Sequence, residues 1–453
     1  MRYRAAEMTT SRPADLRSIF PLWLPMALTW VMMALEGPFL AAVIARLPEP
    51  KIQLAAFGVA FACAIIIESP VIMVLSASTA LIVGPGSFRR LQRFTLALNI
   101  GVTAAMLVLL LTPAFGWFAR EWLALPDDVA AGTRKALLIL LPWPAAIGYR
   151  RFLQGLLIRT GETRRVAYGT MTRLSAMSIT GAVTALATPL PGAAIGAAAL
   201  AAGVSAEAGA TRWMARRAVR RFRDEPASAA AAAAAPDARG SDRLTYAGIL
   251  RFYLPLALTS TIGLAAHPMV TFFMGQAARP LDSLAVLPVI HSLTFLFRSA
   301  GLSFQEVAIA LLGESDANQP GVLRFAGGLA LAASAGLGLI AFTPLCDVWF
   351  GTISGLDAEL TRFARLPVRI LSALPALSVL LALQRALLVH ARRTASITWA
   401  TAAELAGIGL LLFVTIRFFG APGAVAAAVA MLGGRALGNT VLLPALRSRI
   451  HST

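Results

Sequence analysis

The stretch Phe20–Ala45, FPLWLPMALTWVMMALEGPFLAAVIA, decides the fold class of this chain. It is longer than the roughly 20 mostly apolar residues that a membrane-spanning helix needs. It contains a single carboxylate, Glu36, which is followed by Gly37-Pro38. Polar, arginine-bearing residues precede the stretch and no small-residue cleavage site follows it. We therefore interpret it as a retained membrane helix rather than a signal peptide.

The opening of this stretch returns later in the chain. The hexapeptide LPMALT, which begins at Leu24, matches LPLALT, which begins at Leu254. The same register pairs three prolines without a gap: Pro25 with Pro255, Pro38 with Pro268, and Pro50 with Pro280. Matches of Ala and Leu carry little weight in so apolar a chain, whereas prolines in register indicate a duplication. The register continues through most of the later apolar runs, with a shift of a single position before Pro191 pairs with Pro422.

The composition places the chain in a membrane. Of the 453 residues, 58% are hydrophobic, and the mean hydropathy is +0.73, well above that of soluble domains. The formal net charge of +18 sits in short clusters between apolar runs, which is the pattern of topology signals rather than of a nucleic-acid surface. No HExxH metal motif and no GxxxxGK[ST] phosphate loop occur. We expect no enzyme activity, no cofactor, no metal and no nucleic-acid partner.

Twelve apolar runs predict twelve transmembrane helices in two six-helix repeat bundles, an all-α polytopic membrane protein. The runs are 19–46, 52–83, 93–118, 133–158, 165–188, 192–216, 247–274, 283–312, 323–346, 363–389, 395–418 and 422–445. We expect an N-terminal six-helix lobe over 1–216, a cytoplasmic linker over 217–246, rich in arginine and alanine, and a C-terminal six-helix lobe over 247–453. An even number of helices per copy makes this a parallel repeat.

Arginines near the predicted helix ends set the orientation. They precede the first run, join runs 2 and 3, 4 and 5, and 10 and 11, open the linker and close the chain. All of these positions fall on one side, so the positive-inside rule predicts that both termini are cytoplasmic. We expect a multi-pass protein of a bacterial-type inner (plasma) membrane, monomeric, with membrane lipids as its surroundings.

These features resemble the multidrug/oligosaccharidyl-lipid/polysaccharide (MOP) superfamily of MATE-like transporters. The resemblance rests on the two LPxALT openings, on Gln154–Leu157 continuing to Gly161–Thr163, and on Gly420–Ala424, and it covers almost the whole chain. Within the superfamily, Glu36, Pro70, Pro268 and Glu306 resemble the progressive ankylosis branch. The antimicrobial-extrusion and flippase branches stay open. The resemblance implies two six-helix lobes around a central cavity that opens alternately to either side.

Ionisable residues inside membrane helices are costly and are functional candidates by default. The candidates for substrate binding or ion coupling are Glu36, Glu68, Arg298, Glu306, His267, His291, Arg150, Arg151 and Arg385. Glu36 is the first candidate for coupling, because a carboxylate in hydrocarbon takes up a proton more readily than one in water. The alternatives are structural: the arginines can snorkel to an interface, and the histidines can be hydrogen-bonded helix residues.

Glu68 and Arg298 occupy equivalent positions of the two copies, in the register that pairs Pro38 with Pro268, and carry opposite charges. His291 lies seven residues before Arg298 and so on the same helical face. An ion pair between Glu68 and Arg298 is one hypothesis, and it would tie the lobes together. Such a buried pair is weak evidence for net stability.

We interpret the chain as a secondary transporter that works by alternating access. Basic groups outnumber carboxylates among the candidates, which favours a small polyvalent anion such as pyrophosphate, citrate or a nucleotide, exported from the cytoplasm; the ankylosis-type resemblance implies the same class. A lipid-linked saccharide flippase and a proton- or sodium-coupled multidrug antiporter are the alternatives. The coupling ion, H+ or Na+, stays open. A membrane enzyme or scaffold is the remaining hypothesis from a different class.

Overall fold

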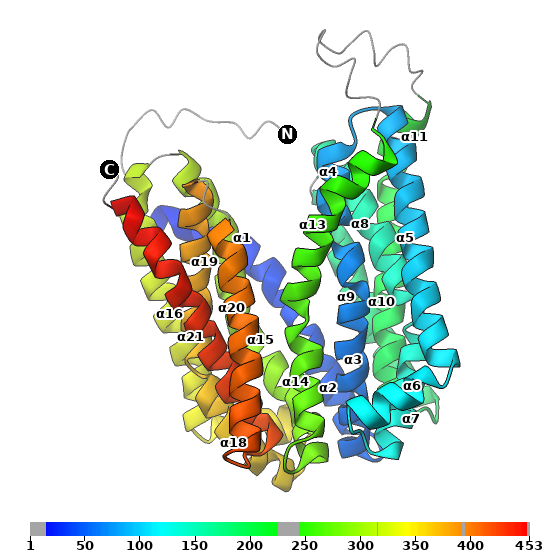
Figure 1. The fold of residues 1–453 in the computed structure, drawn as a ribbon, viewed down its shortest axis with the longest axis vertical. Helices are drawn as coiled ribbons and strands as arrows, with labels where there is room; N and C mark the ends of the chain where they lie inside the picture. Colours follow the sequence, from blue (N-terminus) through cyan, green and yellow to red (C-terminus); the bar gives the residue numbers. More distant parts are fainter. Residues whose placement is uncertain (1–14, 163, 225–243, 315, 392–394, 451–453) are drawn as a thin grey trace. The chain divides into compact units, whose positions relative to one another are not determined.

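The computed structural model describes residues 15–162, 164–224, 244–314, 316–391 and 395–450. These residues are almost entirely helical (Figure 1). Ten helical segments of the described chain are long and apolar enough to cross a membrane. Two further segments, 127–159 and 164–187, fill the remaining predicted positions and carry more charge. The predicted all-helical polytopic class is confirmed. Most of the predicted alanine-rich linker, 225–243, lies outside the described residues.

The duplication appears directly in the helix bounds. Helix α1 (Leu16–Ala34) and helix α2 (Glu36–Ala45) return as α13 (Tyr246–Leu264) and α14 (Ala266–Gly275), with every bound in the register that pairs Pro38 with Pro268. In each copy a single residue interrupts the first membrane segment, Leu35 in one and Ala265 in the other. The prolines follow these breaks by three residues, and a proline removes a helix hydrogen bond and clashes with the preceding turn. The two breaks therefore have the same local cause.

The repeated LPxALT motif contains a local hydrogen bond as well. The hydroxyl of Thr29 donates to the carbonyl of Pro25 at 3.1 Å, and that of Thr259 donates to the carbonyl of Pro255 at 2.8 Å. Threonine hydroxyls commonly bond back to the carbonyl four residues earlier in a helix. The motif thus specifies the same backbone-to-side-chain contact in both copies.

One difference between the copies comes from Pro70. Helix α3 (Pro50–Ile72) contains Pro70, and Met73 separates it from α4 (Val74–Leu81). The equivalent of Pro70 is Ala300, and helix α15 (Pro280–Glu314) continues through it. Proline at 70 leaves the carbonyl of Ile66 without its usual N–H donor, and the hydroxyl of Ser69 donates to that carbonyl at 2.7 Å.

The described chain divides into two compact units. Unit 1 comprises residues 1–58 and 269–453, and unit 2 comprises residues 59–268. The boundaries fall inside α3 and α14, so α1 and α2 group with the C-terminal helices and α13 groups with the N-terminal ones. The repeat boundary at 217–246 and the boundaries of the compact units are therefore different divisions of the chain.

Unit 2 is built around a core of aromatic and aliphatic side chains. It contains the part of α3 from residue 59 onward. The elements that follow are α4, α5 (Pro85–Leu111), α6 (Ala114–Trp117), α7 (Asp127–Ile139), α8 (Trp143–Arg159), α9 (Arg164–Ala187), α10 (Gly192–Met214), α11 (Arg216–Asp224) and α13. Phe88 and Phe152, both 1% exposed, lie at the centre of this core with Leu156. Helix α9 packs along α10 (Figure 1).

Unit 1 repeats this scheme with its own core. Its later elements are α15, α16 (Gln319–Phe342), α17 (Leu345–Asp347), α18 (Ala358–Leu371), α19 (Leu374–His390), α20 (Ala395–Arg417) and α21 (Gly423–Ile450). Phe304 and Val379 centre the core, and Ile19 of α1 packs into it. The indole N–H of Trp23 donates to the hydroxyl of Ser303 at 2.9 Å and ties α1 to α15.

Glycines set the close approach of the paired helices. A Cβ at Gly203 of α10 would stand 3.0 Å from the carbonyl of Arg173 on α9. A Cβ at Gly434 of α21 would stand 3.0 Å from the carbonyl of Glu404 on α20. Small residues allow membrane helices to approach closely. The two glycines are equivalent in the repeat, and each brings a charged residue of the preceding helix against the last helix of its copy.

Candidate functional site

A buried polar cluster lies in unit 2, where α8, α9 and α10 meet. Glu207 of α10 is 1% exposed and is the centre of the cluster. Arg150 of α8 donates from Nη1 to Oε2 of Glu207 in an ion pair. Gln154, also on α8, donates from Nε2 to Oε1 at 3.2 Å, and Nη1 of Arg173 on α9 lies 4.0 Å from Oε2. One carboxylate therefore serves two arginines and an amide.

The local sequence explains how these groups meet. Arg150 and Gln154 are four residues apart, so both project from one face of α8. Gly169 of α9 leaves room for the carboxylate, because a Cβ there would touch Cγ of Glu207 at 3.4 Å. Charges taken out of water need close opposite charges and hydrogen bonds. Both carboxylate oxygens of Glu207 have partners in the cluster. Because two arginines share this one carboxylate, the cluster carries a net positive charge.

Arg151, next to Arg150 on α8, forms no ion pair within this cluster. It is partly buried on α8, and its Nε is buried without a hydrogen bond in the described part of the chain. Among the described residues no carboxylate lies within 4 Å of its guanidinium. A buried unsatisfied donor on a cation is unfavourable until an anion or water contacts it.

Glu68 has a partner within its own unit. The indole N–H of Trp143, the first residue of α8, donates to Oε2 of Glu68 on α3. Arg298 of α15, in unit 1, donates from Nε to the hydroxyl of Ser378 at 3.2 Å. Each member of the hypothetical pair therefore has a neutral hydrogen-bonding partner close to it in the fold. An ion pair between the two stays a prediction.

Unit 1 contains a related but inverted set of charges. Glu404 of α20 accepts from Nε of Arg435 on α21 at 2.8 Å, and both side chains are about one-seventh exposed, at 14% and 15%. Glu404 is the repeat equivalent of Arg173, in the register that pairs Pro191 with Pro422. The fifth helix of the first copy thus carries an arginine that approaches a glutamate, and the fifth helix of the second copy carries a glutamate that binds an arginine. Positions 68 and 298 also carry opposite charges in the two copies, with glutamate in the first copy and arginine in the second.

Arg385 belongs to this set in unit 1. Its Nη2 donates to the hydroxyl of Thr401 at 3.3 Å, and its Nε is buried without a hydrogen bond among the described residues. Its neighbour Gln384 donates to the carbonyl of Asn439 at 3.2 Å. Like Gln154 in the first copy, Gln384 thus bonds to the last helix of its copy.

The other predicted residues lie apart from these clusters. Glu36 is 7% exposed in the first turn of α2, where the adjacent Gly37 approaches Ser292 of α15 so closely that a Cβ would stand 2.8 Å from the serine Cβ. His267 lies in the first turn of α14 and is partly buried. His291 is partly buried on α15, with its ring centroid 6.4 Å from that of Phe295. Glu306, near the end of α15, is exposed.

Sequence reasoning missed four charged members of the clusters: Arg173, Glu207, Glu404 and Arg435. Glu207 and Arg435 lie in helices rich in glycine and alanine. The available signal was the depth of each residue in its run, the criterion that selected the earlier candidates. Among the described residues, no group of three or more His, Cys, Asp or Glu side chains is placed to hold a metal ion.

Comparison with known proteins identifies structures with a similar fold. No protein-family profile matches the sequence, and no characterised protein matches it. The inward-facing conformation of a multidrug resistance MATE family transporter of the MOP superfamily superposes with a TM-score of 0.72 at 14% identity, over 95% of this chain and 98% of that one. The lipid II flippase MurJ in an inward closed conformation gives 0.69 at 11% identity, over 94% and 87%.

A third similar structure is a MOP superfamily transporter from Pyrococcus furiosus, described as having a binding pocket of reverse polarity. It gives a TM-score of 0.64 at 14% identity, over 98% of this chain and 99% of that one. All three similarities extend over nearly the full length of the chain. The protein has the fold of the MATE-type transporters of the MOP superfamily.

Proposed function

We propose that this protein is a secondary transporter that exports a small polyvalent anion by alternating access. The observation that carries the proposal is the set of membrane-embedded arginines without a carboxylate. Arg151, Arg298 and Arg385 each lack a carboxylate within 4 Å in the described chain, and their hydrogen bonds are few. Guanidinium groups bind carboxylate and phosphate oxygens in charge-assisted, often bidentate geometry. Pyrophosphate-, citrate- and nucleotide-like anions fit this chemistry.

The low dielectric of the membrane interior strengthens this preference. Charges interact there several-fold more strongly than in water, so unpaired arginines attract anions and repel cations. Two of the embedded carboxylates, Glu207 and Glu404, are already bound by Arg150 and Arg435. Neither of these two carboxylates is therefore available to an organic cation.

A lipid-linked saccharide flippase is the second candidate. The same unpaired arginines support it, because such a substrate would also present anionic groups, and the fold is similar to that of a solved flippase. The two candidates differ in whether the anion carries a lipid. Transport of a water-soluble anion with no lipid attached would favour the first.

We propose further that both termini are cytoplasmic in a bacterial-type plasma membrane, and that Glu36 couples transport to a cation. The arginine clusters at the helix ends support the orientation. Glu36 lies buried beside the break between α1 and α2, where a change of protonation would act on a bend of the backbone. Replacing Glu36 with glutamine should therefore flatten the pH dependence of flux.

The test is flux into vesicles that contain the purified full-length protein. Labelled pyrophosphate, citrate and a nucleotide serve as anions, and a fluorescent organic cation serves as the alternative substrate. Arg298→Gln should weaken the apparent affinity for the anion roughly tenfold, the cost of one hydrogen bond to a charged group. Arg324→Gln removes an exposed arginine of the same unit and should leave flux unchanged. Cation flux without anion flux, with Arg298→Gln harmless, would overturn the proposal.

A further inference from the structure

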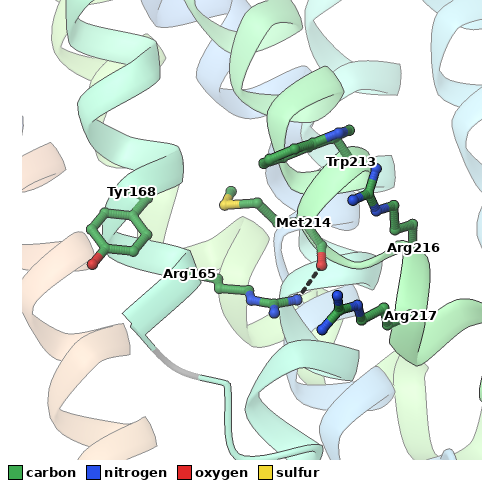
Figure 2. A pocket seen from close by; sticks show the side chains of 6 residues that line it. All are labelled: Arg165, Tyr168, Trp213, Met214, Arg216 and Arg217. Carbon is green, nitrogen blue, oxygen red and sulfur yellow. Dashed lines mark hydrogen bonds between the residues drawn. The ribbon is translucent and has the colours of Figure 1, made fainter.

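A pocket of about 330 Å³ opens at the junction of α9, α10 and α11, far along the sequence from the unpaired arginines of unit 1. Its walls are Arg165 and Tyr168 from the first turns of α9, Trp213 and Met214 from the end of α10, and Arg216 and Arg217 from the start of α11. Figure 2 shows these six side chains around one space. Three guanidinium groups and two aromatic rings line it.

The arginines of the pocket differ in how they are bound. Arg165 is occupied, because its Nη1 donates to the carbonyl of Met214 and lies 2.8 Å from a carboxylate oxygen of Glu162 (Figure 2). Arg216 stacks over Trp213, with its guanidinium carbon 4.9 Å from the ring centroid. Neither Arg216 nor Arg217 has a carboxylate within 4 Å in the described chain. The pocket therefore holds two uncompensated positive charges.

The surroundings place this pocket at the surface of the bilayer. Trp213 is 64% exposed and Tyr168 is 56% exposed, and Trp and Tyr concentrate at the membrane–water interface. Exposed side chains continue from Tyr168 along one face of α9 at helical spacing. Apart from Ser175 they are apolar: Met171, Ile179, Val183 and Leu186. This face suits the hydrocarbon of the bilayer, so an apolar path leads from the pocket along the helix.

Helix α11 supports the same placement. Its apolar side is buried, with Ala218 at 6% and Val219 at 7% exposure. Its other side carries arginines, five of them in nine residues. An amphipathic basic helix directly after a membrane helix is typical of a segment that lies against anionic headgroups.

We propose that this pocket binds the phosphate of an anionic membrane lipid. Arg216 and Arg217 contact the phosphate oxygens, and the rings of Tyr168 and Trp213 flank the glycerol region. The acyl chains follow the exposed apolar face of α9. The continuity of the charged pocket with that apolar face favours a lipid over a free phosphate, because a soluble anion has no acyl chains to contact the apolar side chains of α9. The site is separate from the proposed transport function and stands without it.

Native mass spectrometry of the delipidated full-length protein tests this proposal. Phosphatidylglycerol, phosphatidylcholine with the same acyl chains, and glycerol phosphate are titrated in turn. Phosphatidylglycerol should bind at least tenfold more tightly than phosphatidylcholine. The double variant Arg216→Gln/Arg217→Gln should weaken phosphatidylglycerol about thirtyfold, as expected for two arginines near a membrane surface.

The matched control is Arg220→Gln/Arg223→Gln, which removes the same charge from exposed positions of the same helix outside the pocket. It should change the affinity less than threefold. Arg216→Lys/Arg217→Lys keeps the charge and should keep most of the binding. An equal loss of affinity for phosphatidylglycerol in the two Gln double variants would overturn the proposed binding site, because it would indicate diffuse electrostatic attraction to the whole helix. Glycerol phosphate that competes as strongly as the lipid would overturn the assignment to a lipid.

Discussion

Replacing Glu207 with glutamine should be among the most damaging single substitutions in unit 2. The side chain is 1% exposed and binds Arg150, Gln154 and, at 4.0 Å, Arg173. Glutamine keeps the shape but leaves two arginines without their carboxylate. Breaking a buried ion pair by removing one partner costs about 3–5 kcal/mol in soluble proteins. Polar contacts in membranes contribute less, since the unfolded chain also finds partners there, so we expect a loss of about 3 kcal/mol.

The assay is a double-mutant cycle on the free energy of unfolding, measured by titration with sodium dodecyl sulfate in mixed micelles. Arg150→Gln alone leaves Glu207 with Gln154 and the more distant Arg173 as partners. Arg150→Gln with Glu207→Gln leaves two neutral amides in hydrogen-bonding range. The double variant should therefore be more stable than the sum of the single losses by about 1–3 kcal/mol.

The matched control is Glu404→Gln in unit 1. Its pair with Arg435 is 14–15% exposed, against 1–6% for Glu207 and Arg150. The charge left behind is therefore less deeply buried, and the loss should be about 1 kcal/mol. Strictly additive losses at Arg150 and Glu207, or a loss at Glu207 no larger than that at Glu404, would refute the reasoning.

Three further predictions concern packing, topology and helix contact. A Cβ at Gly155 would lie 2.4 Å from Cβ of a serine on α4, so Gly155→Ala should destabilise the protein by about 1–3 kcal/mol, whereas Gly101→Ala, with nothing within 4 Å, should not lower the melting temperature. A cysteine at Ser228, in a background without the two natural cysteines, should react only with reagent on the cytoplasmic side; labelling from outside would reverse the proposed orientation. Trp23→Phe removes the 2.9 Å hydrogen bond to Ser303 and should lower the free energy of unfolding by about 1 kcal/mol. An unchanged free energy of unfolding would contradict this prediction and indicate that water replaces the indole as the partner of Ser303.

Local sequence was sufficient for the helices and the repeat. Apolar runs of bilayer length predicted the membrane helices, and the register of Pro38 with Pro268 revealed the repeat, whose two copies break at the same point. These features are local, because a proline acts on the turn before it and an apolar run is read from consecutive residues. The same depth argument identified Glu68, Arg298 and Arg385 as embedded charges, together with the neighbouring arginines of α8.

Tertiary structure decided which of those charges are neutralised. Arg150 and Arg151 are neighbours in the sequence, yet one binds Glu207 and the other has no carboxylate within 4 Å in the described chain. The outcome depends on the rotation of α8 against α10 and on the close approach that glycine allows, and neither can be read from a single helix. The same holds for the division into compact units, whose boundaries lie inside α3 and α14. The repeat is a property of the order of residues along the chain, whereas the packing of helices into compact units depends on which apolar faces contact one another in three dimensions.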